Sequence, residues 1–295
     1  MLLPSRPLAL LAGGTSLALA LALALSGCGS EDPAGADTAG LTVEQQALVG
    51  TAGAEYARYV QHETEHLLEG TRAFVTAYKA GQDDRARALY APTRAHWEAV
   101  EPVAETFGDL DPRTDAREAD LEDGQEWTGW HLIEKDLWPA DAGAGYVALT
   151  DTQRTTYADR LLSDLQELEG QVAHADYTGE QIANGAKELL DEVANGKITG
   201  EEEIWSHTDL FDFQANVDGA KKAFEVLEPV VEQTDPELGE TLTTRFAELQ
   251  RLLDEHRRGD GFVSYTALST DQVKALSDAV NALSEPLAQL ATAVA

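Results

Sequence analysis

The sequence predicts an all-α protein made of two four-helix bundles packed against each other. Ala, Leu, Glu and Asp dominate the 295 residues, runs of β-branched residues are scarce, and there are only 10 prolines. Such a composition favours helices, and apolar side chains recur at helical spacing along the chain. A hydrophobic content of 43% is enough to fill a sizeable core and is not typical of a disordered chain.

The N-terminal segment is organised like a bacterial lipoprotein signal. Arg6 provides a positive charge, an apolar stretch follows, and Leu25-Ser26-Gly27-Cys28 places small residues before the only cysteine. We interpret residues 1–27 as a cleaved signal peptide and Cys28 as the lipid anchor. A permanent transmembrane helix is the alternative, because about 18 apolar residues approach the length of a span. Residues 28–42 are small and polar, which predicts a flexible tether.

Residues 43–175 are expected to form the first bundle. Thr42 can cap the first helix together with Gln45, and Gly70 should break or bend that helix. Pro102 should kink or restart the second one. Helices are expected over about residues 42–81, 83–107, 127–138 and 151–175.

Residues 176–295 are expected to form the second bundle. The helices expected there cover about residues 178–195, 207–233, 236–258 and 270–294. Residues 227–232 (LEPVVE) echo residues 100–105 (VEPVAE), which suggests two related halves. In that register His256 falls near the position of His131, but no glutamate follows His256 three positions later. The second half therefore lacks a His-x-x-Glu pattern at this position.

One motif in the first half combines an imidazole with a carboxylate. In Gly129-Trp130-His131-Leu132-Ile133-Glu134, a helix would place His131 and Glu134 on one face. Carboxylates upstream could add oxygen ligands, and these are Glu98, Glu101 and Asp115. Such donors suit a hard or borderline cation such as iron, manganese or zinc, and the mature chain has no thiol besides Cys28. A solvated, ion-pairing helix face is the alternative.

A second motif also merits attention. Residues 62–66 read His-Glu-Thr-Glu-His and satisfy the His-Glu-x-x-His pattern of zinc peptidases. The pattern also arises by chance in glutamate-rich helices. It stays an open alternative for metal binding.

The net charge of −32 comes from 53 acidic and 21 basic residues. Such a field repels nucleic acid, so we expect no nucleic-acid partner. It attracts cations, although an acidic surface also serves solubility alone.

Several stretches resemble one known family. They are Gly129–Trp138, Glu101–Glu105, Phe107–Asp111, Arg117–Asp120 and Ser206–Asn216. Together they are similar to the imelysin-like family with its His-x-x-Glu motif, and most closely to its EfeO/EfeM branch of iron-uptake lipoproteins. The resemblance covers about residues 44–290 and implies the same double-bundle architecture.

The resemblance implies a function outside the cytoplasm. The chain would be the lipid-anchored, iron-binding component of an EfeUOB-like uptake system, capturing and delivering Fe²⁺ or Fe³⁺, with zinc or another divalent cation as a further possibility. Its partners would be the membrane, an iron permease and a dye-decolourising-type haem peroxidase. His131 and Glu134 would be core ligands, and Glu98, Glu101 and Asp115 match the family pattern. Glu203, with His207, could supply a further ligand.

Two features bear on chemistry beyond binding. The longer EfeO form carries a cupredoxin-like domain, which the short segment after Cys28 does not accommodate, so we expect no copper-assisted oxidation within this chain. We expect a binding protein rather than an enzyme. The alternative is an imelysin-like metallopeptidase, using either His62, Glu63 and His66 or Glu134 beside a metal on His131.

Overall fold

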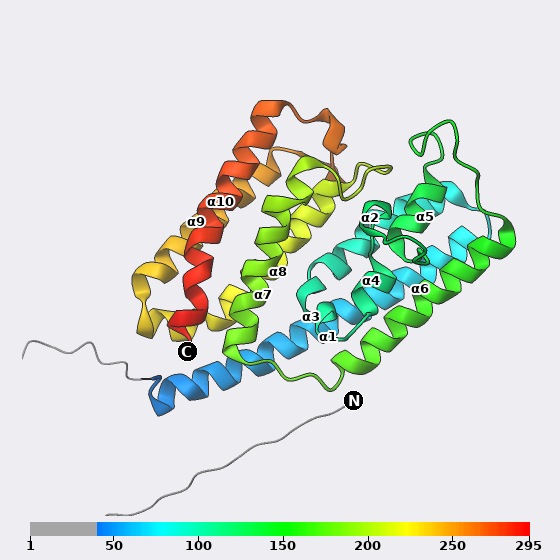
Figure 1. The fold of residues 1–295 in the computed structure, drawn as a ribbon. Coiled ribbons are helices and arrows are strands. Elements are labelled where there is room, and N and C mark those ends of the chain that lie inside the picture. The colour runs from blue at the N-terminus through cyan, green and yellow to red at the C-terminus, as the bar shows by residue number, and fades with distance from the viewer. Residues whose placement is uncertain (1–39) are drawn as a thin grey trace, which may run out of the picture. The chain divides into compact units, whose positions relative to one another are not determined.

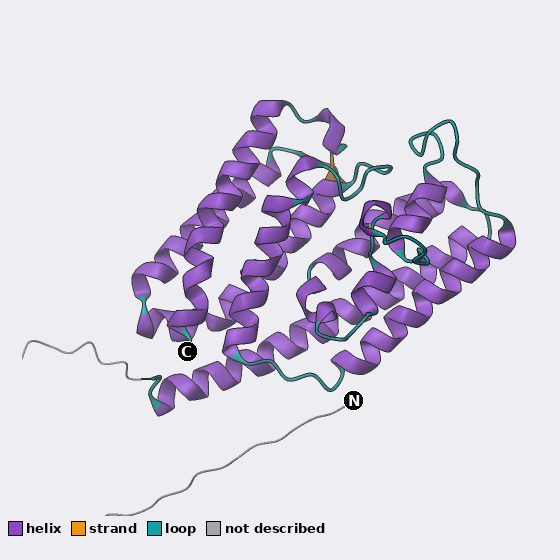
Figure 2. Ribbon diagram, in the orientation of Figure 1, coloured by secondary structure: helices purple, strands orange, loops and turns teal. Residues whose placement is uncertain are grey.

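The predicted all-α fold is confirmed in the computed structural model, which describes residues 40–295 (Figure 2). The predicted signal peptide, residues 1–27, the anchor residue Cys28 and residues 28–39 of the tether lie outside the described residues. Within residues 40–295 the only sheet is one antiparallel pair of two-residue strands. No helix in this range is both long enough and apolar enough to span a bilayer.

The α-helices are α1 (Val43–Lys79), α2 (Asp83–Glu98), α3 (Glu101–Glu105), α4 (Leu110–Thr114), α5 (Trp130–Leu137), α6 (Asp151–Val172), α7 (Gly179–Asn195), α8 (Asp209–Thr234), α9 (Pro236–Asp254) and α10 (Thr270–Ala293). Short 3-10 helices are η1 (Glu118–Asp120), η2 (Lys197–Thr199) and η3 (Tyr265–Ala267), and the strands are β1 (Arg257–Arg258) and β2 (Gly261–Phe262).

Most of the predicted helices are present, with identifiable local causes. Thr42 and Gln45 form the expected capping box at the start of α1. Pro102 separates α2 from α3, because a proline ring clashes with the carbonyl four residues earlier, and α2 ends at that residue, Glu98.

The expected break at Gly70 is wrong, because α1 continues through it. A side chain at Gly70 would lie 2.7 Å from Thr93 Oγ1, so this glycine permits close packing of α1 on α2.

The helices lie in two groups that α1 joins (Figure 1). α2 and α6 pack against α1, whereas α7, α8, α9 and α10 pack against one another. α1 also contacts α7 and α8, and α2 contacts α8, so the groups meet along these helices. The predicted boundary at residue 175 falls between α6 and α7. That each group is a separate domain stays a prediction.

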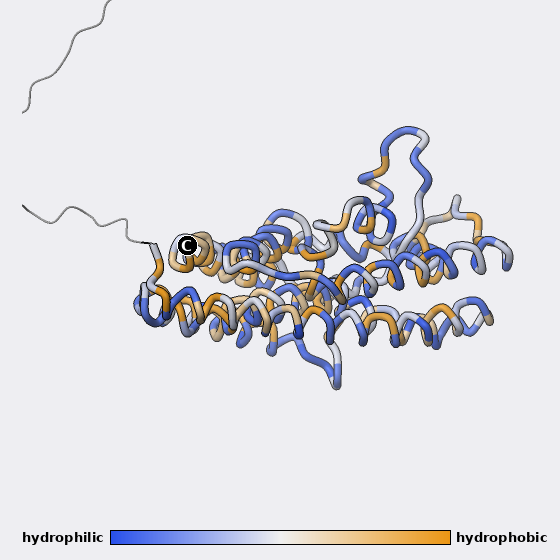
Figure 3. The backbone as a smooth tube through the Cα atoms, turned by 90° about the horizontal axis from the view of Figure 1, so that it is seen from below, coloured by the Kyte–Doolittle hydropathy of each residue, from blue (hydrophilic) through white to orange (hydrophobic). Residues whose placement is uncertain are grey.

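One cluster of buried apolar side chains extends through both groups. Apolar and polar segments alternate along each helix, as Figure 3 shows, so each helix turns one face toward this core. The largest fully buried side chains include Trp97 of α2 and Trp130 of α5. These two helices carry Glu98 and His131 as the next residues in the chain, so the packing of the core also positions the candidate site.

Gly219→Ala should destabilise the protein, although alanine favours a helix over glycine. The added methyl group would lie 2.4 Å from the carbonyl oxygen of Ala99, so α8 and α2 would have to move apart. Such overpacking costs about 1–3 kcal/mol. The control Gly170→Ala, on α6 with nothing within 4 Å, should gain up to about 1 kcal/mol. Urea unfolding measures both, and equal stabilisation would contradict the close approach of α8 to α2.

Candidate metal centre

The start of α5 is held tightly against the segment that carries Asp115. Gly129 has φ of +91°, and a side chain there would lie 2.1 Å from the carbonyl oxygen of Thr114. Only glycine tolerates both constraints. Trp127 Nε1 donates a hydrogen bond of 2.7 Å to the carbonyl of Ala116. The residues on either side of Asp115 are thus attached to the start of α5, which explains the glycine in Gly-x-His-x-x-Glu.

His131 and Glu134 lie on the same face of α5, as their spacing predicts, and both are fully buried. His131 Nδ1 lies 3.0 Å from Glu134 Oε2. The other oxygen of Glu134 accepts hydrogen bonds from the backbone N–H groups of Trp205 (3.0 Å) and Ser206 (2.8 Å). Glu134 therefore orients the His131 ring and joins α5 to the loop before α8.

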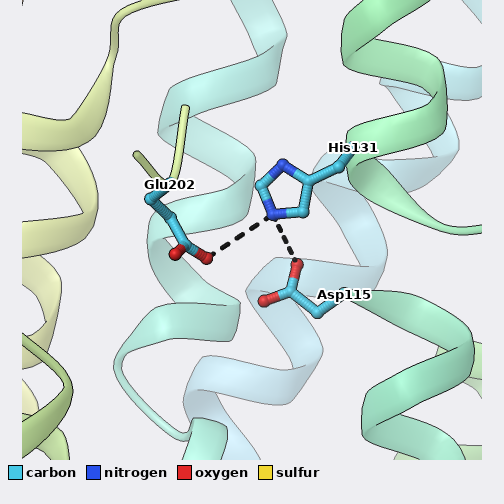
Figure 4. A group of neighbouring side chains, drawn as sticks. All are labelled: Asp115, His131 and Glu202. Carbon is cyan, nitrogen blue, oxygen red and sulfur yellow. Dashed lines mark ion pairs between the residues drawn. The ribbon is translucent and has the colours of Figure 1, made fainter. Parts of the chain in front are cut away.

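The other ring nitrogen of His131 has no hydrogen-bond partner. This Nε2 points between two carboxylates and lies 3.5 Å from Asp115 Oδ1 and 3.5 Å from Glu202 Oε1 (Figure 4). A buried polar atom without a partner is rare in proteins and needs a physical reason. An imidazole nitrogen facing two carboxylate oxygens is a donor set that a metal ion can use.

Two three-residue groups around His131 could hold a metal. In each, one donor atom per residue lies within 4.8 Å of the others. The first is Asp115, His131 and Glu202, and the second is His131, Glu134 and Glu203. All of these residues are buried. Both the positions of these donor atoms and their chemical types therefore suit a cation.

The neighbours of His131 raise its pKa to about 10. Burial and the positive charge of Arg94 both oppose protonation, but the neighbouring carboxylates of Glu134, Glu202 and Asp115 outweigh them. A metal at Nε2 must therefore displace a proton at neutral pH.

Arg94 of α2 lies at the centre of the carboxylates. Its fully buried guanidinium pairs with Asp115, and lies 2.5 Å from Glu98 and 3.0 Å from Glu202. Its Nε atom lies 2.6 Å from Glu203. These partners come from α2, from the end of α4 and from the loop after η2. One cation thus draws together three segments that are distant in the sequence.

Lys197 is the second buried cation. Its ammonium group pairs with Glu98, and lies 2.8 Å from Glu101 and 3.3 Å from Glu192. Burial opposes its charge, yet these carboxylates hold its pKa well above the usual value. Glu98 is held further by Asn216 Nδ2, which donates 3.1 Å to its carboxylate.

The site contains more carboxylic acids than the cations can neutralise. Burial and neighbouring carboxylates raise some pKa values well above the usual carboxyl range, namely those of Glu101, Glu203 and Asp212. Burial acts on Glu98 and Glu202 too, but the charges of Lys197 and Arg94 hold their pKa values below the usual range. Both oxygens of Asp212 lack hydrogen-bond partners. A bound cation would relieve this excess of acid.

A cavity of about 580 Å³ leads to the same residues. Asp115, Glu202 and Lys197 line it together with acidic residues of α7 and η1. A third potential metal group, Glu101, Asp111 and Asp115, lies along its wall. Acidic walls concentrate cations, so this cavity gives them an approach to His131.

The structure brings some of the predicted site residues together and separates others. Those next to His131 are Glu134, Asp115 and Glu203. Glu98 and Glu101 lie in the same buried network but are paired by Lys197 and Arg94. His207 is half-buried and its ring lies 4.0 Å from Asp141. The three-residue groups of the described chain include neither His207 nor His256, and none contains His62 or His66.

Sequence reasoning missed Arg94, Lys197 and Glu202. Glu202 lies in the acidic run 201–203, which looks like a solvated segment. Arg94 precedes Glu98 by one helical turn, the only local signal that these two side chains could pair. Asp209 and Asp212 lie within the family-like run Ser206–Asn216 and both are buried. Burial raises the pKa of Asp209 to about 6.

Comparisons with known proteins agree on the family. The model of the imelysin family, peptidase family M75, matches residues 52–290. An Efem/EfeO family lipoprotein of Staphylococcus haemolyticus is 40% identical over 285 residues, covering 94% of this chain and 97% of the relative. Another from Staphylococcus aureus is 41% identical over 240 residues, covering 80% and 82%.

A solved structure shares the fold. It is described as an iron-regulated protein A precursor from Parabacteroides distasonis and superposes with a TM-score of 0.63 at 13% identity, covering 88% of this chain and 97% of that one. The long alignments to the lipoproteins establish the relationship. The chain belongs to the imelysin family and, within it, to the Efem/EfeO family of lipoproteins.

Proposed function

We propose that this protein is the extracytoplasmic, lipid-anchored iron-binding component of an iron-uptake system. The observation that carries the proposal is His131 Nε2, which is buried, lacks a hydrogen-bond partner and faces the carboxylates of Asp115 and Glu202. Iron is the cargo, taken as Fe²⁺ or Fe³⁺ by His131, Asp115 and Glu202, with Glu134 and Glu203 on the other side of the ring. Glu98 and Glu101 supply further oxygens if Lys197 moves aside.

The donor set suits capture followed by release. Carboxylates and one imidazole bind hard and borderline cations, and without thiolates the bound metal can exchange. The buried network already contains Arg94 and Lys197, so its carboxylates stay partly neutralised at every stage. The acidic cavity supplies cations from the solvent side.

The relatives support membrane anchoring, and the two protein partners are part of the proposal. The matched Efem/EfeO proteins are named lipoproteins. We extend this to Cys28, which would carry the lipid after removal of residues 1–27 and place the helical domain outside the cytoplasm. An iron permease would receive the metal, and a dye-decolourising-type haem peroxidase would work beside it.

The metallopeptidase alternative has less support. Hydrolysis needs a metal-activated water and a general base poised near neutral pH. In the His62–His66 motif the base would be Glu63. Burial raises the pKa of Glu63, but the hydrogen bond to His96 and the nearby His62 outweigh it and hold this pKa below the usual value. Such a carboxylate is a weak base, and its oxygens contact Nδ1 of His62 and Nδ1 of His96 rather than the Nε2 side that a zinc ion would occupy, which favours a carrier.

Iron should raise the melting temperature of the purified protein. A ligand present at 100 times its Kd stabilises the folded state by about 2.7 kcal/mol, which for a domain of this size is about 5–10 °C. His131→Ala and Glu134→Ala should abolish the increase, whereas His256→Ala should keep it. Calorimetric titration with Fe²⁺ under anaerobic conditions tests binding directly. An H131A/E134A double variant that binds iron as tightly as the parent would place the site elsewhere.

Iron binding should release protons. Because the His131 pKa is raised to about 10, this imidazole contributes stability that is fully present below about pH 6.5 and is lost as pH rises through about 10. As the pH rises through this range, Nε2 loses its proton and becomes available to bind a metal. Apparent affinity should rise by up to about tenfold per pH unit for each proton released.

Titrations in two buffers of different ionisation enthalpy count these protons. The charged and titratable groups facing His131 are Arg94, Asp115, Glu134, Glu202 and Glu203. At pH 7 the parent and His256→Ala should each release at least about one proton per iron. Binding without proton release would contradict a protonated His131.

Lys197→Met should weaken the fold but strengthen iron binding. The lysine ammonium and a bound cation neutralise the same carboxylates, Glu98 and Glu101, so removal of the ammonium removes a competitor. Breaking a buried ion pair costs about 3–5 kcal/mol, read from urea unfolding without iron. Lys187→Met is the matched control, because this α7 lysine is only half-buried and pairs with Asp191; neither the stability nor the iron affinity should change much. Weaker iron binding in a folded Lys197→Met variant would make Lys197 a supporting residue rather than a competitor.

A further inference from the structure

A pair of histidines on α1 has a geometry that the buried centre does not explain. His62 and His66 are one helical turn apart and exposed. Their Nε2 atoms lie 3.1 Å from each other, with ring centroids 4.3 Å apart and planes inclined by 69°. Both nitrogens thus point at one spot on the surface of α1.

The spacing of these nitrogens matches a chelated cation. Imidazole nitrogens bind such metals at about 2.0–2.1 Å, so two of them on one ion lie about 2.9 Å apart at 90° and about 3.3 Å apart at the tetrahedral angle. The observed 3.1 Å falls between these values. A single hydrogen bond between the rings is the competing explanation for the distance.

The surrounding residues orient the pair. Glu63 Oε1 lies 3.6 Å from Nδ1 of His62, the nitrogen on the far side of the ring from Nε2. Glu63 Oε2 lies 2.6 Å from Nδ1 of His96, and the His96 ring stacks on His66 with centroids 5.3 Å apart. A carboxylate on the outer nitrogen of a ligating histidine is the usual way in which proteins fix its direction.

We propose that His62 and His66 bind a second cation, a late divalent transition metal such as Cu²⁺ or Zn²⁺. Two imidazoles without a carboxylate in direct contact favour these ions, with Cu²⁺ bound more tightly than Zn²⁺. The three-ligand groups of the described chain all involve His131 or Asp115, so water completes the coordination here. The site is therefore open and distinct from the buried iron centre.

The experiment isolates the pair from that centre. The full chain carrying His131→Ala and Glu134→Ala is dialysed against ZnCl₂ and, separately, CuCl₂, and bound metal is measured by elemental analysis. We expect about one equivalent at metal concentrations that saturate a two-histidine site. Adding His62→Ala and His66→Ala should remove it. His174→Ala, an exposed histidine on the loop after α6, should leave it unchanged.

The electron paramagnetic resonance spectrum of bound Cu²⁺ provides a second readout. Hyperfine splitting from two imidazole nitrogens should appear with the pair present and vanish in the His62→Ala/His66→Ala variant. Equal binding with and without the pair would overturn the proposal and leave the 3.1 Å contact as a hydrogen bond. Because His131 and Glu134 are already replaced in these variants, this outcome says nothing against iron binding at His131. A failure of the parent protein to bind iron would likewise leave this test valid.

Discussion

The buried guanidinium of Arg94 is the constraint on which the centre of this protein depends. A charge with no exposed surface is tolerated only when carboxylates pair with it closely. Arg94 finds them on separate segments, with Glu98 on α2, Asp115 after α4 and Glu203 in the loop before α8. These segments must converge for the fold to form, so the interaction that stabilises the interior also assembles the donors around His131.

This arrangement explains how so many carboxyl groups can be buried inside a helical protein. Arg94 and Lys197 neutralise part of their charge, and the raised pKa values of Glu101 and Glu203 show that these carboxyl groups hold a proton more tightly than usual. A metal ion entering from the acidic cavity would then replace positive charge that already balances these carboxylates. In the proposed function, affinity would depend on the exchange of the metal ion for an internal cation or a proton, which would allow release as well as capture.

The local features were predictable from sequence, whereas the network was not. The cap at Thr42 and the shared face of His131 and Glu134 depend on residues three positions apart, within one helical turn. The pairing of Arg94 with Glu202 joins residues 108 positions apart, and no periodicity encodes it. For Glu203 the only sequence signal is its place beside a family-like run. Its neighbour Glu202, which approaches Nε2 of His131, looked like one of several solvated acids.

The two metal sites proposed here differ in what holds their donors in place. Around His131 the donors are buried, most of them are oxygens, and hydrogen bonds and internal cations fix them, so entry requires loss of a proton and some rearrangement. At His62 and His66 the donors are exposed nitrogens that one helix presents at chelating distance. Hard cations favour the first set and late transition metals the second. If both proposals hold, one chain would bind two classes of cation, because its donors differ in chemistry and in burial.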